Sequence, residues 1–303
     1  MSAPRVLLSL ARTLAPRGPC GSSLRSLHRT LLSVRRMSSR RQMDHLQRTA
    51  DQTRQTAVYP AQVCGITDES DTVKRLSLAV HPDFSFKAGQ WVDLFIPGLE
   101  TVGGFSMCSS PGLLQRDGLI ELAVKYTQHP PAHWLHTQCS AGAQVALRVG
   151  GDFFFDPAPS DPALDLLLVG GGVGINPLYS ILLHAADLLR LKRTNVSSAH
   201  LCHSAKNCHE LLFRSSIVDV CDEFPDTFSC EFHVTQQDGD VEPRLQPHTT
   251  VRGRITAEHL EVLVRPQSTL CFLCGPPPML QTLSSVLKEL GVPEDRIRFE
   301  KWW

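Results

Sequence analysis

The 303-residue sequence lacks three features that would assign it to familiar classes of protein. No uninterrupted apolar run reaches the roughly 18 to 20 residues of a membrane-spanning helix, so we expect no transmembrane span. The formal net charge is zero, which gives no general attraction to nucleic acid. The ten cysteines do not contain the C-x4-C-x2-C spacing that holds a plant-type iron–sulfur cluster.

The cysteines also lack a tight disulfide pattern, and we expect most of them to be reduced thiols. Two groups resemble zinc motifs, "CHSAKNCH" (Cys202 to His209) and "CFLC" (Cys271 and Cys274). The second lies in an apolar, strand-like run, where residues three apart point to opposite faces. We therefore expect no metal site, and a zinc site on Cys202, Cys208 and Cys271 is the alternative.

Acidic residues are absent from positions 1–43, which hold nine arginines, and the first acid is Asp44. Serines are frequent, and Leu and Val alternate with the arginines, which is typical of a mitochondrial transit peptide. This leader predicts import into the mitochondrial matrix. A secretory signal peptide, with "VLLSLA" as its apolar core, and a disordered basic tail are the alternatives. Residues 44–60 are interpreted as a linker.

Two periodicities divide the remaining chain. Between about Val63 and Phe155, apolar residues alternate at period two in "TVKRLSLAV", "QWVDLFI", "IELAVKY" and "AQVALRV". This pattern predicts an antiparallel barrel or sandwich at 61–157, with one helix at "PAHWLHTQCS". The proline-rich stretch "DPAPSDPALD" then indicates a linker at 158–165.

From 166 to 303, apolar strands alternate with stretches of helical spacing. "LLLVGGG" is a continuous apolar run that suits a buried parallel strand, and "PLYSILLHAADLLRL" follows it as a helix. Further strands ("SSAHLC", "FSCEFHV", "STLCFLCG") alternate with helices ("HELLFRSSIVDVC", "TAEHLEVLV", "PPMLQTLSSVLKEL"). This order predicts a doubly wound α/β domain.

The turn in "LLLVGGGVGINP" joins the first strand of this domain to its first helix. Gly172 and Gly174 allow a ligand to approach the backbone, and the helix N-terminus suits a pyrophosphate. Proline is tolerated in that first turn because no N–H is needed there. A plain tight turn is the alternative. The candidate nucleotide-binding residues are Gly171, Gly172, Val173, Gly174, Ile175, Asn176 and Pro177.

A second strand ends in "CFLCGPPPML", at the carboxyl edge of the same sheet, where open α/β folds bind ligands. Cys274, Gly275 and Pro276 are therefore candidates to lie beside the molecule that the glycine turn holds. A buried thiol before a turn is the alternative.

Together these motifs resemble the ferredoxin–NADP reductase superfamily of flavoproteins. "GGGVGINP" and "CGPPPM" match its nicotinamide-nucleotide loops, while "FKAGQWVDLFIP", "GDFFF" and "FEKWW" resemble its barrel and its C-terminus. The resemblance covers about Val63 to Trp303. It implies an antiparallel six-stranded β-barrel that carries a flavin, FAD or FMN, followed by a doubly wound α/β domain that binds NAD or NADP.

The resemblance also implies an activity. Hydride would pass from the nicotinamide to the flavin, and electrons would leave to a separate acceptor, a protein or small molecule. Cys274 and Glu300 would lie beside the nicotinamide as catalytic residues, and Trp302 or Trp303 would stack on the flavin. Two tryptophans that only cover apolar surface are the alternative for this tail.

The flavin loop of the family, Arg-x-Tyr-Ser, corresponds to residues 103–106 inside "VGGFSMCSSPG". Phe105 and Ser106 match its Tyr and catalytic Ser, but Gly103 replaces the arginine that pairs with phosphate. The family's Gly-x-x-Ser/Thr pyrophosphate motif is similarly altered, with His129 and Ala132 at its ends. Lys125 is the candidate substitute cation, and His129 or His133 is the alternative for part of that charge.

These departures leave a second function open, a non-enzymatic nucleotide-binding or partner-binding module that has lost its flavin. The choice of coenzyme is also open from sequence. Ser204 and Lys206 lie where relatives hold the 2′-phosphate of NADP, and Ser204 as a strand-end cap is the alternative. We expect NAD, or little discrimination between the two.

Overall fold

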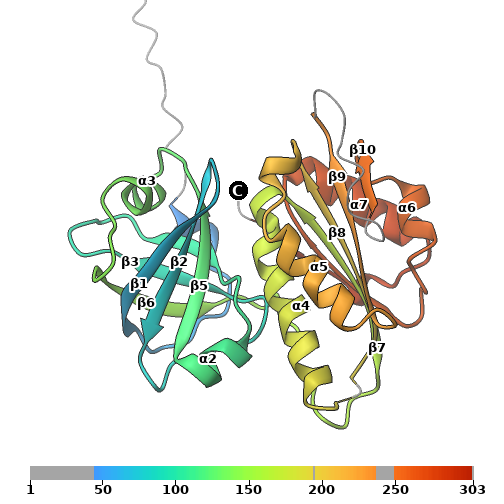
Figure 1. The fold of residues 1–303 in the computed structure, drawn as a ribbon, viewed down its shortest axis with the longest axis horizontal. Helices are drawn as coiled ribbons and strands as arrows, with labels where there is room; N and C mark the ends of the chain where they lie inside the picture. The colour runs from blue at the N-terminus through green and yellow to red at the C-terminus, as the bar shows by residue number, and fades with distance from the viewer. Residues whose placement is uncertain (1–43, 194, 237–248, 302–303) are drawn as a thin grey trace, which may run out of the picture. The chain divides into compact units, whose positions relative to one another are not determined.

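The computed structural model describes residues 44–193, 195–236 and 249–301. The predicted leader, Trp302 and Trp303 lie outside the described residues. An antiparallel sheet is followed along the chain by a parallel one (Figure 1). In the part of the chain that the structure describes, no helix has the length and hydropathy needed to cross a membrane.

The antiparallel sheet is a closed six-stranded barrel, as predicted. Its strands follow the order β4-β3-β6-β1-β2-β5. A bridge between Met107 and Leu122 joins the chain after β4 to β5, so the two edges of the sheet meet. Alternate side chains, such as Leu76 and Leu78, are buried in the interior. The strands are β1 (Tyr59–Ser70), β2 (Val73–Val80), β3 (Trp91–Phe95), β4 (Gly103–Ser106), β5 (Leu119–Lys125) and β6 (Gln144–Gly150).

The stretch "VGGFSMCSSPG" was interpreted as a loop, but it forms β4 and the start of α2 (Pro111–Asp117). β4 contains two glycines and has little strand propensity of its own, and pairing with β3 holds it extended. α2 has recognisable ends. The Ser110 side chain caps its N-terminus, Pro111 stands in its first turn, and Gly118 ends it with left-handed backbone.

The stretch interpreted as a linker carries helix α1 (His45–Arg48) and is bound to the barrel. The buried carboxylate of Asp93 lies 2.8 Å from His45 Nε2, 3.0 Å from Arg54 Nε and 2.8 Å from Arg148 Nε. Burial raises the pKa of Asp93, but hydrogen bonds from these three side chains outweigh burial and lower it below its usual value. The His45 ring also covers the Cα of Gly104 in β4. The segment therefore packs beside the predicted flavin loop.

The second sheet is parallel throughout and has the strand order β10-β9-β8-β7-β11-β12. Helices α4 and α5 cover one face, and α6 and α7 cover the other (Figure 1). The predicted doubly wound domain is confirmed. Its strands are β7 (Leu164–Gly171), β8 (Val196–Ala205), β9 (Phe228–Val234), β10 (Thr249–Arg252), β11 (Thr269–Cys274) and β12 (Ile297–Glu300). Its helices are α4 (Ile175–Arg190), α5 (Arg214–Glu223), α6 (Ala257–Glu261) and α7 (Pro277–Glu289).

Two details of this domain differ from the sequence prediction. The helix expected over "HELLFRSSIVDVC" is divided into a short 3-10 turn, η2 (Cys208–Glu210), and α5. Phe213 between them adopts left-handed backbone, with φ of 57°, because its ring is buried and stacks on Tyr179. The edge strand β10 was not predicted, since four residues are too few to show a period.

The barrel and the α/β domain share polar contacts across α4 and β5. The Asn176 amide donates to the Ala123 carbonyl at 2.6 Å, and the Ser180 hydroxyl donates to the Ser109 carbonyl at 2.6 Å. Both donors are buried, so each bond is shielded from water. α4 therefore connects the glycine turn at its N-terminus to the barrel.

Candidate active site

The glycine turn predicted from sequence lies at the carboxyl end of β7, beside the end of β11. Cys274 pairs with Gly170 across the two strands. A Cβ added to Gly174 would lie less than 3.0 Å from the backbone of Cys274 and Gly275. Only glycine fits at this position. The two turns therefore pack against each other, and both predicted motifs lie together.

A cavity of about 560 Å³ opens above this turn. The ends of β7, β8 and β9 and the first turns of α7 surround it, as expected for a ligand site at the switch point of a doubly wound sheet. From the sequence-predicted set, its walls include Gly171, Gly172, Val173, Pro276 and Lys125.

Other members of that set have a packing role. Ile175 and Pro177 are buried in the first turn of α4, and Asn176 donates its amide to the barrel. Gly174 and Gly275 allow the two turns to pack together. The packing of these residues fixes the position of the two turns whose backbone continues into the cavity wall.

Lys125 is engaged in an ion pair. Its Nζ lies 3.1 Å from Glu210 Oε2, and Glu210 also accepts from the Thr72 hydroxyl at 2.8 Å. Burial raises the pKa of Glu210, while the bonds from Thr72 and Lys125 outweigh burial and lower it. The lysine proposed as a substitute cation is therefore largely neutralised by a carboxylate of the other domain.

Two other cations line the cavity near the end of β8. Lys206 and Arg254 are exposed, and neither has an ion-pair partner within the described ranges. Ser204 lies in the same wall. Sequence reasoning identified Ser204 and Lys206 but missed Arg254, which follows β10 and enters the cavity only through tertiary structure.

Cys274 and Glu300 are neighbours on β11 and β12, paired in register. Both are buried, and Glu300 Oε2 has no hydrogen-bond partner among residues 44–193, 195–236 and 249–301. The pKa of Glu300 is raised to about 7 in total. Burial raises it most, a hydrogen bond from the Lys301 N–H lowers it, and the charge of Asp152 raises it further. This carboxyl can therefore gain or lose a proton near neutral pH.

The two cysteines of "CFLC" point to opposite faces, as expected. Cys271 packs under α7, and Cys274 packs with residues of α4 and the barrel. They cannot hold the same ion. Among the described side chains, the group of three that could ligate one metal ion contains no cysteine.

The predicted flavin loop lies in the barrel on β4. Ser106 is buried, and the half-buried Phe105 ring covers Gly103. A Cβ at position 103 would lie 2.5 Å from Phe105 Cε2 and 2.9 Å from Pro131 Cβ. An arginine at this position would therefore displace the Phe105 ring.

Comparisons with known proteins agree with this architecture. The family described as "Oxidoreductase NAD-binding domain" matches residues 168–285. Oxidoreductase NAD-binding domain-containing protein 1 of Danio rerio is 66% identical over 271 residues, which are 88% of this chain and 100% of that protein.

Two solved structures have the same fold. A cytochrome P450 reductase of Amycolatopsis has a TM-score of 0.67 at 24% identity, over 82% of this chain and 71% of that chain. A ferredoxin NADP+ reductase of Neisseria gonorrhoeae with bound FAD and NADP has a TM-score of 0.64 at 18% identity, over 81% of this chain and 99% of that chain. The chain belongs to the family of oxidoreductase NAD-binding domain-containing protein 1.

Proposed function

We propose that this protein is an NAD(P)H-dependent flavin oxidoreductase that passes electrons to a separate acceptor. The main support is the arrangement at the carboxyl edge of the parallel sheet. A cavity of about 560 Å³ lies over the glycine turn, and Cys274 and Glu300 end the two adjoining strands. Neither residue lines this cavity, but both lie at the same edge of the sheet, where the nicotinamide end of a nucleotide held by the turn would lie beside an ionisable carboxyl.

Each group of residues has a distinct task in this proposal. The backbone from Gly171 to Val173 and the N-terminus of α4 bind the pyrophosphate. The buried Cys274 and its neighbours exclude water from the nicotinamide, and Glu300 holds or releases a proton beside it. A bound flavin would supply the chemistry that takes hydride from the nicotinamide and passes electrons to the acceptor.

The barrel provides few backbone donors for the phosphates of a flavin. Helix α3 (Pro130–Thr137) begins with two prolines, which have no N–H, and His133 N–H donates to His129 O at 2.9 Å. Ala132 is then the first residue of α3 that carries an N–H. An additional positive charge would compensate for this loss.

We propose that Arg48 of α1 supplies this charge. It is half-buried, and its positive charge is close enough to His129, the N-cap of α3, to lower the pKa of that histidine, second only to burial. The neighbouring His45 ring covers Gly104 in the predicted flavin loop. In this proposal Arg48, from the N-terminal segment, replaces the positive charge of the family's flavin-loop arginine, whose position Gly103 occupies.

We expect Arg48→Ala to weaken flavin binding by about tenfold to a hundredfold, since a hydrogen bond to a charged group contributes about 1.5–3 kcal/mol. Fluorescence titration of flavin-stripped protein with FAD and FMN measures this change. Arg116→Ala is the control, because Arg116 is an exposed arginine of the same domain. Equal flavin affinity in Arg48→Ala and wild type would contradict the assignment without affecting the proposed reaction.

We propose that Ser204, Lys206 and Arg254 allow the cavity to accept NADPH as well as NADH. Arg254→Ala should raise the KM for NADPH by about tenfold or more and change the KM for NADH little, because only NADPH carries the 2′-phosphate. Steady-state kinetics with both coenzymes tests this, with Lys288→Ala as a control on α7. Equal effects on both coenzymes would argue against a phosphate site.

The second candidate function is a nucleotide-binding module without flavin. The Phe105 ring over Gly103 and the two prolines of α3 favour it. Thermal denaturation of the full-length chain separates the two functions. Stabilisation by FAD or FMN as well as NADH, with NADH oxidation by an artificial acceptor, supports the oxidoreductase. Stabilisation by NADH alone supports the module.

The electron acceptor is a separate molecule in this proposal. In this proposal the barrel would hold the flavin and the parallel sheet would hold the nicotinamide nucleotide. We also propose that residues 1–43 direct the protein to the mitochondrial matrix, on the basis of their arginine-rich and acid-free sequence.

A further inference from the structure

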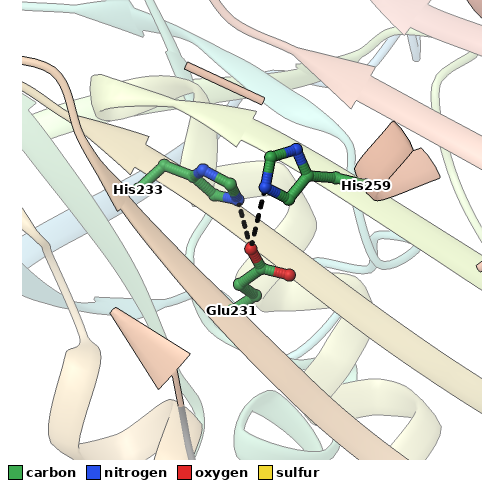
Figure 2. A group of neighbouring side chains, drawn as sticks. All are labelled: Glu231, His233 and His259. Atoms are coloured by element: carbon green, nitrogen blue, oxygen red, sulfur yellow. Dashed lines mark ion pairs between the residues drawn. The ribbon is translucent and has the colours of Figure 1, made fainter. Parts of the chain in front are cut away.

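We propose that Glu231, His233 and His259 bind a divalent transition-metal ion, with Zn²⁺ as the preferred class. Glu231 and His233 are two residues apart on β9, so they project from the same face of the sheet. His259 comes from α6, which covers that face. One ligand atom from each of the three lies within 4.8 Å of the other two (Figure 2).

The separations suit one small ion. Ligands of a tetrahedral Zn²⁺ at its usual bond lengths are about 3.3 Å apart. Glu231 Oε1 lies 3.0 Å from His233 Nε2 and 3.7 Å from His259 Nε2. Both nitrogens face the same carboxylate oxygen (Figure 2). The two histidine nitrogens lie within 4.8 Å of each other, so a closer approach of the two rings would bring all three atoms to an ion.

His233 is the most informative of the three. Its side chain is fully buried, yet neither ring nitrogen has a hydrogen-bond partner among the described residues. Nε2 lies 3.0 Å from Glu231 Oε1 but forms no hydrogen bond with it. A buried polar atom without a partner is costly. A metal ion between the ring and the carboxylate would give Nε2 and Glu231 Oε1 a common partner.

His259 is oriented by a residue outside the ligand group. Its Nδ1 lies 2.7 Å from the Thr256 hydroxyl, at the N-terminus of α6. Metal binding at Nε2 requires the tautomer with a proton on Nδ1, which would donate to this hydroxyl. Outer hydrogen bonds of this kind fix the tautomer of metal-binding histidines. The contact from the Thr256 N–H to Nδ1, at 3.2 Å, would be given up in that form.

The donor set indicates the class of ion. Two imidazoles and one carboxylate suit Zn²⁺, Co²⁺ and similar ions, and three protein ligands leave a position for water. Cys202 is opposite Glu231 on β8 but does not belong to the group. The site therefore differs from the cysteine-based zinc alternative of the sequence, and it replaces the expectation that the protein holds no metal.

The test uses full-length protein stripped with a chelator and titrated with Co²⁺, whose visible spectrum reports its ligands. We expect one ion per chain, with d–d absorption and no thiolate charge-transfer band. Zn²⁺ should displace the Co²⁺ and raise the melting temperature. His259→Gln and Glu231→Gln should each weaken binding by at least about a hundredfold, because even outer partners of metal ligands contribute ten- to a hundredfold.

Two matched variants complete the design. His209→Gln removes an exposed histidine outside the group and should leave Co²⁺ binding unchanged. Thr256→Val should weaken binding by about ten- to a hundredfold, while Thr256→Ser keeps the hydroxyl and should restore it. A thiolate band would overturn the proposal, as would wild-type affinity in both His259→Gln and Glu231→Gln. If a variant unfolds, the ligand spectrum of wild-type protein and the Thr256→Ser comparison still decide the result.

Discussion

Gly174→Ala is expected to weaken NAD(P)H binding by at least tenfold and to destabilise the protein by about 1–3 kcal/mol, the usual cost of overpacking. The added Cβ would lie less than 3.0 Å from three backbone atoms of Cys274 and Gly275. Backbone atoms cannot rotate away as a side chain can. The ends of β7 and β11 must therefore separate, which distorts the turn that binds the pyrophosphate. Calorimetric titration with NADH and urea denaturation measure the two effects.

Gly172→Ala is the comparison for this prediction. Gly172 has φ of 56°, but an added Cβ there meets nothing within 4 Å. The variant should be less stable by only about 1–2 kcal/mol from the left-handed backbone, with β7 and β11 still in contact. Wild-type affinity and stability in Gly174→Ala would mean that the two turns do not pack as described.

Glu300→Gln is expected to remove the contribution that Glu300 makes to the pH dependence of the free energy of unfolding. The folded-state pKa of Glu300 is about 7, above the ordinary value of 4.5. The folded state therefore keeps the Glu300 proton between these values, and the contribution of Glu300 to wild-type stability falls as pH rises from 4.5 to 7. Below pH 4.5 the carboxyl is protonated in both states and the effect vanishes. Above pH 7 the full penalty, up to about 3 kcal/mol, applies to wild type and not to the glutamine variant.

Urea denaturation between pH 4.5 and pH 8 measures this difference. Glu289→Gln is the control, because Glu289 is an exposed carboxylate of the same domain. The burial of glutamine adds a cost of its own, but that cost does not change with pH. If the free-energy difference between Glu300→Gln and wild type is the same at both ends of this range, Glu300 does not titrate near neutral pH.

The parts of the fold that carry the strongest local patterns could be predicted from sequence. The turn from Gly170 to Gly174 follows a buried apolar strand and precedes a helix, so strand, turn and helix support one another. By contrast, β4 is held extended by its neighbour β3, since its two glycines give no strand signal. The break before α5 depends on the packing of Phe213 against Tyr179, which no local pattern reveals.

The site was only partly predictable for a similar reason. Lys125 matches the family position, but its partner Glu210 lies in the other domain and becomes visible only in the fold. Arg48 and His45 belong to a stretch predicted as a linker, and His45 holds that stretch to the barrel through the buried Asp93. His259 is distant in sequence from Glu231, and only tertiary structure brings their side chains together.

The absorption spectrum of the full-length protein, recorded as isolated and then after anaerobic addition of NADH, tests the central claim most directly. The proposed function predicts the absorption bands of a bound flavin, their loss on addition of NADH, and their return when an artificial electron acceptor is added. A colourless protein that binds NADH but cannot be loaded with FAD or FMN would contradict it and would identify the chain as a nucleotide-binding module.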